Sequence, residues 1–422
     1  MFRTKRGVSV AVLAGAMVAL SATSAAPAPG PGPERITLTA TGEQIERGSG
    51  GAALTADGRF AAFVSEDPDV VPGDTNERSD VFVRDLRRGT VERVNVSSDG
   101  SQAEGGSGSH RAEISADGRY VAFMSTAKNL AEWPSGPPAG HVEDVYVHDR
   151  STGRTERVSV GADGGSAWAF DTFDMSADGR YVAFGASAQR MEGAANDRTL
   201  AYVVDRRTGT AQRVSDRVPA DWYVSGVTLS ADGSHLAYVQ RHPRGGRHEL
   251  WHVDLGTGEQ KPVNAVAGEF TDGSPGGVTL SADGRYLSYA SFDESVVPEA
   301  PEYTWELYVY DSRTGTTRWI THDGAGGLGA GLLSPDGRRL AYTTETRSGD
   351  EVVAENVHVR DLRSGRTQLV TRTLAGGPQS EGSAAPSAFA RGGRLLSVYS
   401  ASSELVPGDT NAAGDGFLFR LR

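Results

Sequence analysis

The sequence predicts an all-β protein: a closed β-propeller of seven blades, each a four-stranded antiparallel sheet. A phrase of the type Ser-Ala-Asp-Gly-Arg-Tyr recurs along the chain, with its aspartate at Asp57, Asp117, Asp178, Asp232, Asp283 and Asp336. A second turn of the type Asp-x-x-x-Gly follows each copy. Beyond the segment 1–26, no part of the chain has the periodicity of an amphipathic helix. Paired strands that repeat at a period of about 50 residues are typical of propeller blades.

The copy from Gly276 to His322 shows how one blade is built. Its four expected strands are 277–281, 286–290, 306–310 and 317–320. The first two strands are joined by the Asp-Gly turn, where glycine allows the positive φ of a tight hairpin. The Asp-x-x-x-Gly turn joins the last two strands, and alternating apolar residues mark each strand.

The two ends of the repeat array predict a closed ring. A degenerate seventh copy of the repeat begins near 387–389 and supplies only three strands, the last of them at 416–420. The segment 34–39 matches the fourth strands of earlier copies, such as 92–96. We therefore expect this N-terminal segment to complete the last blade, which would remove the open sheet edges that promote aggregation.

The segment 1–26 has the pattern of a secretory signal peptide. Three basic residues precede an apolar run at 8–20, and small residues lead up to Ala26. The run is too short to span a bilayer, so we expect a protein secreted by the general secretory route rather than a membrane-spanning one. Residues 27–33 would be a Pro/Gly leader and residues 34–422 the propeller. The chain has no cysteine, which excludes disulfides and thiolate metal sites.

The charge of the chain argues against nucleic acid as a partner. The formal net charge is -12, and removal of the three basic residues of the signal peptide takes it to -15. Only three lysines occur in the whole chain, so no lysine-rich patch is available to neutralise phosphates. We expect an acidic extracellular monomer whose partner is another protein or a polysaccharide.

The repeat resembles that of the TolB-type propellers, a WD-repeat-like family also described as PD-repeats. Its nearest copy is Ser-Pro-Asp-Gly-Arg-Arg-Leu-Ala-Tyr at 334–342, and the resemblance covers essentially all of the mature chain. It implies a β-propeller. It does not specify a function, because such propellers serve as scaffolds, as binding modules and occasionally as enzymes.

One motif superficially matches a zinc protease. Residues 248–252 read His-Glu-Leu-Trp-His, a pattern that binds zinc only when a helix brings both histidines to one face. This segment aligns with the third strands of other copies. On a strand the two histidines would lie about 13 Å apart, too far for a single zinc ion.

Two equivalent loops are candidate calcium sites. The phrase Val-Pro-Gly-Asp-Thr-Asn occurs at 71–76 and again at 406–411, each time followed by an aspartate at the same spacing. The candidate ligands are Asp74, Asn76, Asp80, Asp409, Asn411 and Asp415. Calcium prefers such oxygens, but a turn held by Asp and Asn side chains explains the pattern without an ion. We favour the turn, leave calcium open and expect no other cofactor.

Aromatic and acidic residues gather in the loops between strands. In a propeller, the loops from fourth to first strands and from second to third strands lie on one face. The candidate binding residues in or beside these loops are Trp133, Trp168, Asp171, Trp222, Tyr223 and His110. Exposed rings beside carboxylates suit a stacked sugar or a peptide. Rings that fill gaps between blades are the alternative.

Two functions follow from these candidates. The first is a non-catalytic binding or scaffolding module that acts outside the cell through its loops. The second is a carbohydrate-active enzyme, a metal-assisted lyase or hydrolase at the channel mouth. Some propellers of this kind are pectin-oligomer lyases with histidine-held metal, and here His110 and His322, from different blades, are the candidate ligands. Histidines scattered over the solvated surface are the alternative, which we favour. Convergence of both with Asp171 would favour the enzyme.

Overall fold

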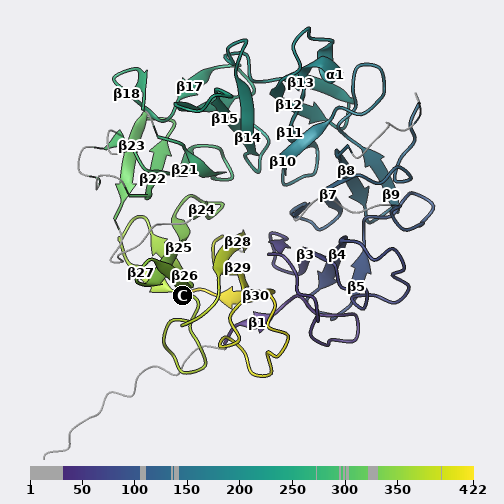
Figure 1. Ribbon diagram of the computed structural model, residues 1–422, viewed down its shortest axis with the longest axis vertical. Helices are drawn as coiled ribbons and strands as arrows, with labels where there is room; N and C mark the ends of the chain where they lie inside the picture. The colour runs from purple at the N-terminus through teal and green to yellow at the C-terminus, as the bar shows by residue number, and fades with distance from the viewer. Residues whose placement is uncertain are drawn as a thin grey trace, which may run out of the picture. The chain divides into compact units, whose positions relative to one another are not determined.

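The computed structural model describes residues 32–104, 111–134, 136, 142–271, 273–293, 296–297, 300, 304–321, 331–390 and 392–422, with the backbone alone at Asp171. Residues 32–422 form one compact unit. Seven four-stranded antiparallel sheets follow one another around a ring (Figure 1), which confirms the predicted seven-bladed propeller. The expected signal peptide, 1–26, lies outside the described residues.

Strands account for nearly all of the regular structure. Blade 1 contains β2 (Ala53–Leu54), β3 (Phe60–Ser65), β4 (Asp80–Asp85) and β5 (Val91–Arg93). Blade 2 contains β6 (Ala112–Ile114), β7 (Tyr120–Ser125), β8 (Asp144–Asp149) and β9 (Arg154–Arg157). Blade 3 contains β10 (Ala169–Met175), β11 (Tyr181–Ser187), β12 (Thr199–Asp205) and β13 (Thr210–Arg213). Blade 4 contains β14 (Tyr223–Leu229), β15 (His235–Arg241), β16 (His248–Asp254) and β17 (Gln260–Pro262). Blade 5 contains β20 (Gly276–Leu280), β21 (Tyr286–Ser291), β22 (Glu306–Asp311) and β23 (Thr316–Ile320). Blade 6 contains β24 (Leu332–Leu333), β25 (Arg339–Ser348), β26 (Glu351–Asp361) and β27 (Thr367–Leu369). Blade 7 contains β28 (Ala384–Ala390), β29 (Leu395–Ser400), β30 (Asp415–Arg420) and β1 (Glu34–Arg35), and a small hairpin of β18 (Ala265–Val266) and β19 (Glu269–Phe270) lies between blades 4 and 5.

The helix α1 (Ala188–Glu192) follows β11. Within the described part of the chain, no helix has the length and apolar character needed to cross a bilayer.

The N-terminal strand closes the ring as expected. In blade 7 the strand order is β1-β30-β29-β28, and Glu34 pairs with Leu418. Figure 1 shows the purple β1 beside the yellow β30. The strand itself is shorter than the predicted 34–39. One more hydrogen bond, from Ile36 N to Gly416 O at 2.8 Å, extends the pairing, and then the chain turns so that Leu38 pairs with Gln44 instead.

In each blade one pair of large side chains lies directly opposite across the second and third strands. The pairs are Phe63–Phe82, Phe123–Tyr146, Phe184–Tyr202, Tyr238–Trp251, Tyr289–Tyr308, Tyr342–His358 and Val398–Phe417. Directly opposed aromatic residues stabilise a sheet beyond the area that they bury. In blades 1 to 6 the apolar run after the Asp-Gly turn supplies one member of the pair.

The Asp-Gly turns join neighbouring blades. A Cβ atom on Gly179 of blade 3 would lie 2.4 Å from Cδ2 of Tyr120 in blade 2, and Gly233 stands in the same relation to Tyr181. Gly179 also has a φ of 69°, where a side chain is strained. A backbone hydrogen bond from Ala116 N to Ala177 O, 2.7 Å long, runs between the same two turns. The recurring Gly-Arg-Tyr therefore packs one blade on the next.

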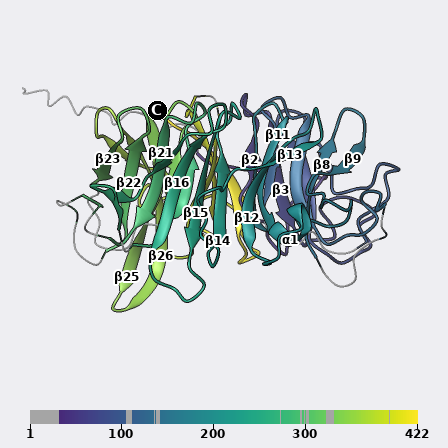
Figure 2. The same cartoon turned by 90° about the horizontal axis from the view of Figure 1, so that it is seen from above.

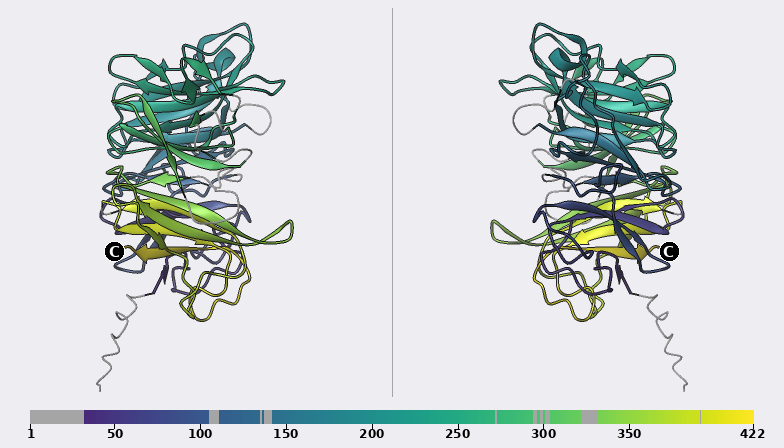
Figure 3. Two further views of the ribbon diagram at one scale, coloured as in Figure 1. Left: turned by 90° about the vertical axis from the view of Figure 1, so that its left-hand side faces the viewer. Right: turned by 90° about the vertical axis from the view of Figure 1, so that its right-hand side faces the viewer.

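The propeller has two different faces. The turn face carries the Asp-Gly and Asp-x-x-x-Gly turns. Within a blade, the two turns are joined by ion pairs such as Arg180–Asp205 at 2.6 Å. The loop face carries the longer connections, including α1 and the tip of the β25–β26 hairpin (Figure 2). That hairpin extends beyond its neighbours (Figure 3). The predicted loop clusters therefore share one face.

The zinc-like pattern lies on a strand, as expected. Residues 248–252 belong to β16. The buried His252 ring makes a 2.7 Å hydrogen bond with the carbonyl oxygen of Gly284 in the next blade. His252 thus connects two blades.

Candidate functional site

Two of the predicted aromatic residues line an open groove on the loop face. The groove holds about 500 Å³ and lies between blades 3 and 4. One wall is Asn196–Thr199, from the loop between β11 and β12. The other is Ala220–Tyr223, which leads into β14 and contains Trp222, and Pro243 completes the lining. We call this hollow the loop-face groove.

The groove combines aromatic faces with charged groups. Asp221 and Asp197 are exposed, and Trp222 and Tyr223 are half-buried. The Nε2 atom of His242 lies 3.2 Å from Oδ2 of Asp221, and the His242 ring meets Trp222 edge-on at 6.1 Å between centroids. Ring orientation is therefore held by neighbouring side chains while part of each ring stays accessible.

The framework of the groove is fixed by Arg198. Its Nη1 atom donates hydrogen bonds to the carbonyls of Val218 and Pro219. These bonds tie the β11–β12 loop to the segment before Trp222. Preorganised walls lower the entropic cost of binding a ligand.

Trp168 and Trp133 lie on the same face but outside the groove. The guanidinium of Arg190, from α1, stacks over the Trp168 ring at 4.3 Å, and that of Arg157 over the Trp133 ring at 3.7 Å. Both tryptophans are half-buried, and cation–π contact with arginine already uses one ring face. A binding role for these two residues stays a prediction.

The side chains of the two remaining candidates lie outside the described part of the chain. His110 lies outside the described residues, as does His322, and at Asp171 only the backbone in β10 is described. Among the residues that the structure covers, no group of three or more histidine and acidic side chains is placed to hold a metal ion. The convergence that would favour an enzyme therefore stays untested.

In both candidate calcium loops an arginine lies between the acids. Nη1 of Arg93 is 3.3 Å from Oδ1 of Asp74 and 2.8 Å from Oδ2 of Asp80. Arg35 contacts Asp409 at 2.9 Å and Asp415 at 3.2 Å in the same way. We call each such group an arginine clasp.

The amides of the loops also have partners within the protein. The Asn76 side chain donates to Ala103 O, and the Asn411 side chain donates to Ile45 O. Gln102 donates to Asp74 at 2.7 Å, and Gln44 donates to Asp409 at 2.8 Å. A guanidinium thus neutralises the carboxylates that calcium would need, which supports the turn interpretation. Calcium binding stays a prediction.

Blade 2 has a related group in which an arginine lies near a single buried acid. Asp144, at the start of β8, accepts a 2.6 Å hydrogen bond from Ser159 Oγ and lies 3.8 Å from Arg157. The ring of Trp133 stacks on the guanidinium of this arginine. Burial raises the pKa of Asp144 to about 6. The hydrogen bonds and the charge of Arg157 lower this pKa, but burial has the larger effect.

This raised pKa predicts a pH dependence of stability. A carboxyl whose folded-state pKa exceeds its unfolded value of about 3.9 stabilises the fold below that value and loses the effect as the pH rises through about 6. Acidification from pH 7 to 5 should therefore raise this group's contribution to the free energy of unfolding by about 1 kcal/mol. Asp144→Asn should flatten the slope measured by denaturant unfolding, and the exposed Asp216→Asn should not. Identical slopes for wild type and Asp144→Asn would contradict the assignment.

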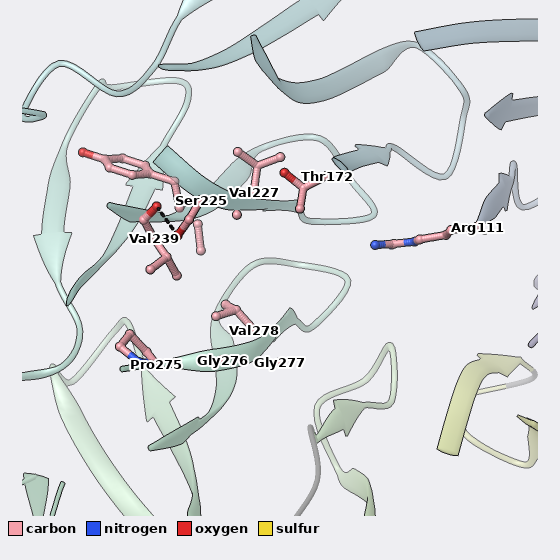
Figure 4. A pocket seen from close by; sticks show the side chains of 12 residues that line it. Arg111, Thr172, Ser225, Val227, Val239, Pro275, Gly276, Gly277 and Val278 are labelled. Carbon is pink, nitrogen blue, oxygen red and sulfur yellow. Dashed lines mark hydrogen bonds between the residues drawn. The ribbon is translucent and has the colours of Figure 1, made fainter. Parts of the chain in front are cut away.

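A second cavity lies in the central channel. It holds about 290 Å³ and is lined by the first strands of blades 3, 4 and 5, by Ala237–Val239 of β15 and by Arg111 of blade 2 (Figure 4). Nε of Arg111 donates to Oε1 of Glu113 at 2.7 Å. Sequence reasoning missed Arg111 and the wall Asn196–Thr199. Arg111 is a single charged residue before a short strand, and Asn196–Thr199 is a polar loop with one arginine. Neither has a sequence pattern that marks a binding site.

Comparison with known proteins supports the fold. A family profile for the N-terminal β-propeller domain of prolyl oligopeptidase matches residues 160–324, less than half of the chain. No curated protein matches the chain. Among solved structures, an oligogalacturonate lyase in complex with manganese is similar at a TM-score of 0.58 with 14% identity, covering 89% of this chain and 90% of the other.

Two further structures are similar. The oligogalacturonate lyase of Vibrio parahaemolyticus has a TM-score of 0.56 with 13% identity, covering 90% of this chain and 89% of the other. TolB of Acinetobacter baumannii has a TM-score of 0.39 with 18% identity, covering 78% of this chain and 64% of the other. The fold and the two lyase structures define a β-propeller protein, and the finer resemblance to TolB-type repeats stays a prediction.

Proposed function

We propose that this chain is a secreted, non-catalytic β-propeller with TolB-type repeats that binds a cell-wall carbohydrate in the loop-face groove. The observation that carries the proposal is the pairing of the accessible rings of Trp222 and Tyr223 with the exposed carboxylates of Asp197 and Asp221 around one hollow of about 500 Å³. Aromatic faces stack on the apolar faces of sugar rings, and carboxylates accept hydrogen bonds from sugar hydroxyls.

The exposure of the groove to solvent favours ligand binding over catalysis. Its two carboxylates are exposed, and Asp221 lies beside His242, so water reaches the groups that a catalyst would need to shield. Secretion of the protein is supported by the sequence at 1–26, which would bring the groove into contact with wall polymers.

Retention on purified insoluble polysaccharides tests the proposal. The wild-type protein should be retained by at least one of a panel of peptidoglycan, cellulose, chitin and pectin. The double variant Trp222→Ala with Tyr223→Ala should bind about tenfold more weakly or worse, because anchoring aromatics carry much of the energy of a site. Trp305→Ala is the matched control, since this ring is 41% exposed but does not line the groove.

Two results would overturn the proposal. One is the absence of retention on every polysaccharide of the panel. The other is equal retention of wild type and double variant while both keep the same melting temperature. Capture of a protein from a culture supernatant in a Trp222-dependent way would instead indicate a protein partner.

A carbohydrate-active enzyme is the second candidate. The names of two similar structures suggest a substrate to assay, oligogalacturonate, with and without manganese. We expect no unsaturated product above the enzyme-free blank. Product formation by wild type that is lost in His110→Ala or His322→Ala would establish the enzyme instead.

A further inference from the structure

The hairpin of β25 and β26 is much longer than the strands beside it. β25 and β26 have 10 and 11 residues, whereas their neighbours in blade 6, β24 and β27, have two and three. β24 pairs with Leu340 and Ala341, and β27 pairs with His358–Arg360, all of them far from the tip. The tip therefore projects from the loop face as a two-stranded ribbon, as Figure 3 shows.

The outer edge of β26 is open near this tip. Gly382 covers the edge at one point: it pairs in parallel with Ala354, and its carbonyl oxygen accepts a 3.0 Å hydrogen bond from the backbone N–H of Glu355. Closer to the tip, the segment Glu351–Val353 has no ladder partner but β25 in the part of the chain that the structure describes. A free strand edge of this kind can add a strand from another chain.

Two adjacent valines at the tip are exposed. Val352 is 39% and Val353 is 37% accessible to solvent. Arg347 pairs with Val352 and Thr346 pairs with Ala354, so the ladder with β25 skips Val353. A bulge of this kind re-aims side chains. The two valines offer an apolar contact to the side chains of an added strand, because β-branched residues on neighbouring strands pack together.

The charge of the tip identifies the kind of strand that fits. Residues 345–355 include four acids and one arginine. Arg347 is bound to Glu345, with 2.6 Å between Nη2 and Oε2. Asp350 and Glu351 are exposed, and neither forms an ion pair with a described residue. The tip therefore attracts basic side chains and repels a second copy of this chain, which carries the same acids.

We propose that the tip of the β25–β26 hairpin binds a basic, extended segment of a partner protein along the outer edge of Glu351–Val353. The backbone of the bound segment pairs with this edge. Its lysines or arginines contact the carboxylates of Asp350 and Glu351, and its apolar residues, which alternate with the basic ones along a strand, pack on Val352 and Val353. This surface is separate from the loop-face groove and does not depend on the role of that groove.

Calorimetric titration of the wild-type protein with three synthetic peptides tests the surface. The first is a ten-residue peptide of alternating lysine and valine. Its two counterparts alternate glutamate with valine and lysine with serine. Wild type should bind the Lys–Val peptide and should bind each counterpart about tenfold more weakly or worse, because each counterpart lacks one of the two kinds of contact.

Charge reversal at the tip tests the electrostatic part. The double variant Asp350→Lys with Glu351→Lys should lose the Lys–Val peptide and bind the Glu–Val peptide instead, because the attraction and the repulsion change places. Glu269→Lys is the control for an added lysine, since this acid is also exposed in a hairpin but belongs to another part of the ring. It should leave binding of the Lys–Val peptide unchanged.

Removal of the valines tests the apolar part. Val352→Ser with Val353→Ser should weaken binding of the Lys–Val peptide about tenfold or more, and Val160→Ser, at a valine that is 40% exposed elsewhere, should not. All these changes are at exposed side chains, so melting temperatures should match that of wild type; if one double variant fails to fold, the other still reports on the tip. No binding of the Lys–Val peptide, equal binding of either counterpart, or binding that a folded double variant leaves unchanged would overturn the proposal.

Discussion

A chain that begins at Gly42 should be destabilised by on the order of 5 kcal/mol relative to one that begins at Glu34. The shorter chain lacks β1, which covers the edge of β30 in blade 7. It also lacks Ile36, which is fully buried in the core between blades 7 and 1.

The loss of Arg35 adds an electrostatic cost. Asp409 and Asp415 are almost completely buried, with side chains 4% and 0% exposed, and Arg35 is their ion-pair partner. Removing one member of a buried ion pair strands the other charge. Thermal and urea unfolding of the two chains measure the difference. Superimposable unfolding curves would contradict closure of the ring by this strand.

Gly179→Ala should cost about 3 kcal/mol or more, while Gly209→Ala in the same blade should cost about 1 kcal/mol. The two glycines have nearly equal φ angles, 69° and 70°, so both variants carry the same backbone strain. They differ in what the new methyl group meets. At Gly209 no described atom lies within 4 Å, whereas at Gly179 the Tyr120 ring of the preceding blade lies 2.4 Å away.

The difference between these two variants therefore measures the contact between blades. Urea unfolding gives both free energies under identical conditions. Tyr120→Ala combined with Gly179→Ala should recover part of the loss from the glycine change, since the ring atoms nearest the new methyl group are removed and only the Cβ of Tyr120, at 3.0 Å, remains close. Equal destabilisation by Gly179→Ala and Gly209→Ala would show that the Asp-Gly turn does not pack on the neighbouring blade.

The architecture was predictable because turn residues in each repeat mark where its strands begin and end. Each Asp-Gly turn, such as the one at Gly179, needs a positive φ, and each following apolar run supplies a cross-strand partner such as Phe184. These are local signals. The match between the N-terminal segment and earlier fourth strands then predicted closure, which the pairing of β1 with β30 confirms.

The ends of elements were less predictable. The N-terminal strand was expected to extend to Thr39, but the ladder with β30 holds only Glu34 and Arg35. The Thr39 hydroxyl accepts a 3.0 Å hydrogen bond from the backbone N–H of Glu43, so the chain is already turning. Threonine has a high strand propensity, and the local turn overrides it.

The sites depend on contacts that sequence spacing does not encode. The groove needs Trp222 from one blade and Asn196 from the loop of another, and the repeat predicts only that both lie on the same face. The clasps require an arginine such as Arg93, at the end of a fourth strand, to reach Asp74 in the loop before the third strand.

The role of the loop-face groove is tested most directly by hydrogen–deuterium exchange of the wild-type protein with and without the polysaccharide fragment that it retains. Ligand in the groove should slow exchange at Asn196–Thr199 and at Ala220–Tyr223, because both walls lose contact with water and become less mobile. The turn face, which is on the opposite side of the ring, should exchange at the same rate in both samples. Protection confined to the turn face, or none in these two segments at saturating ligand, would contradict carbohydrate binding in the groove.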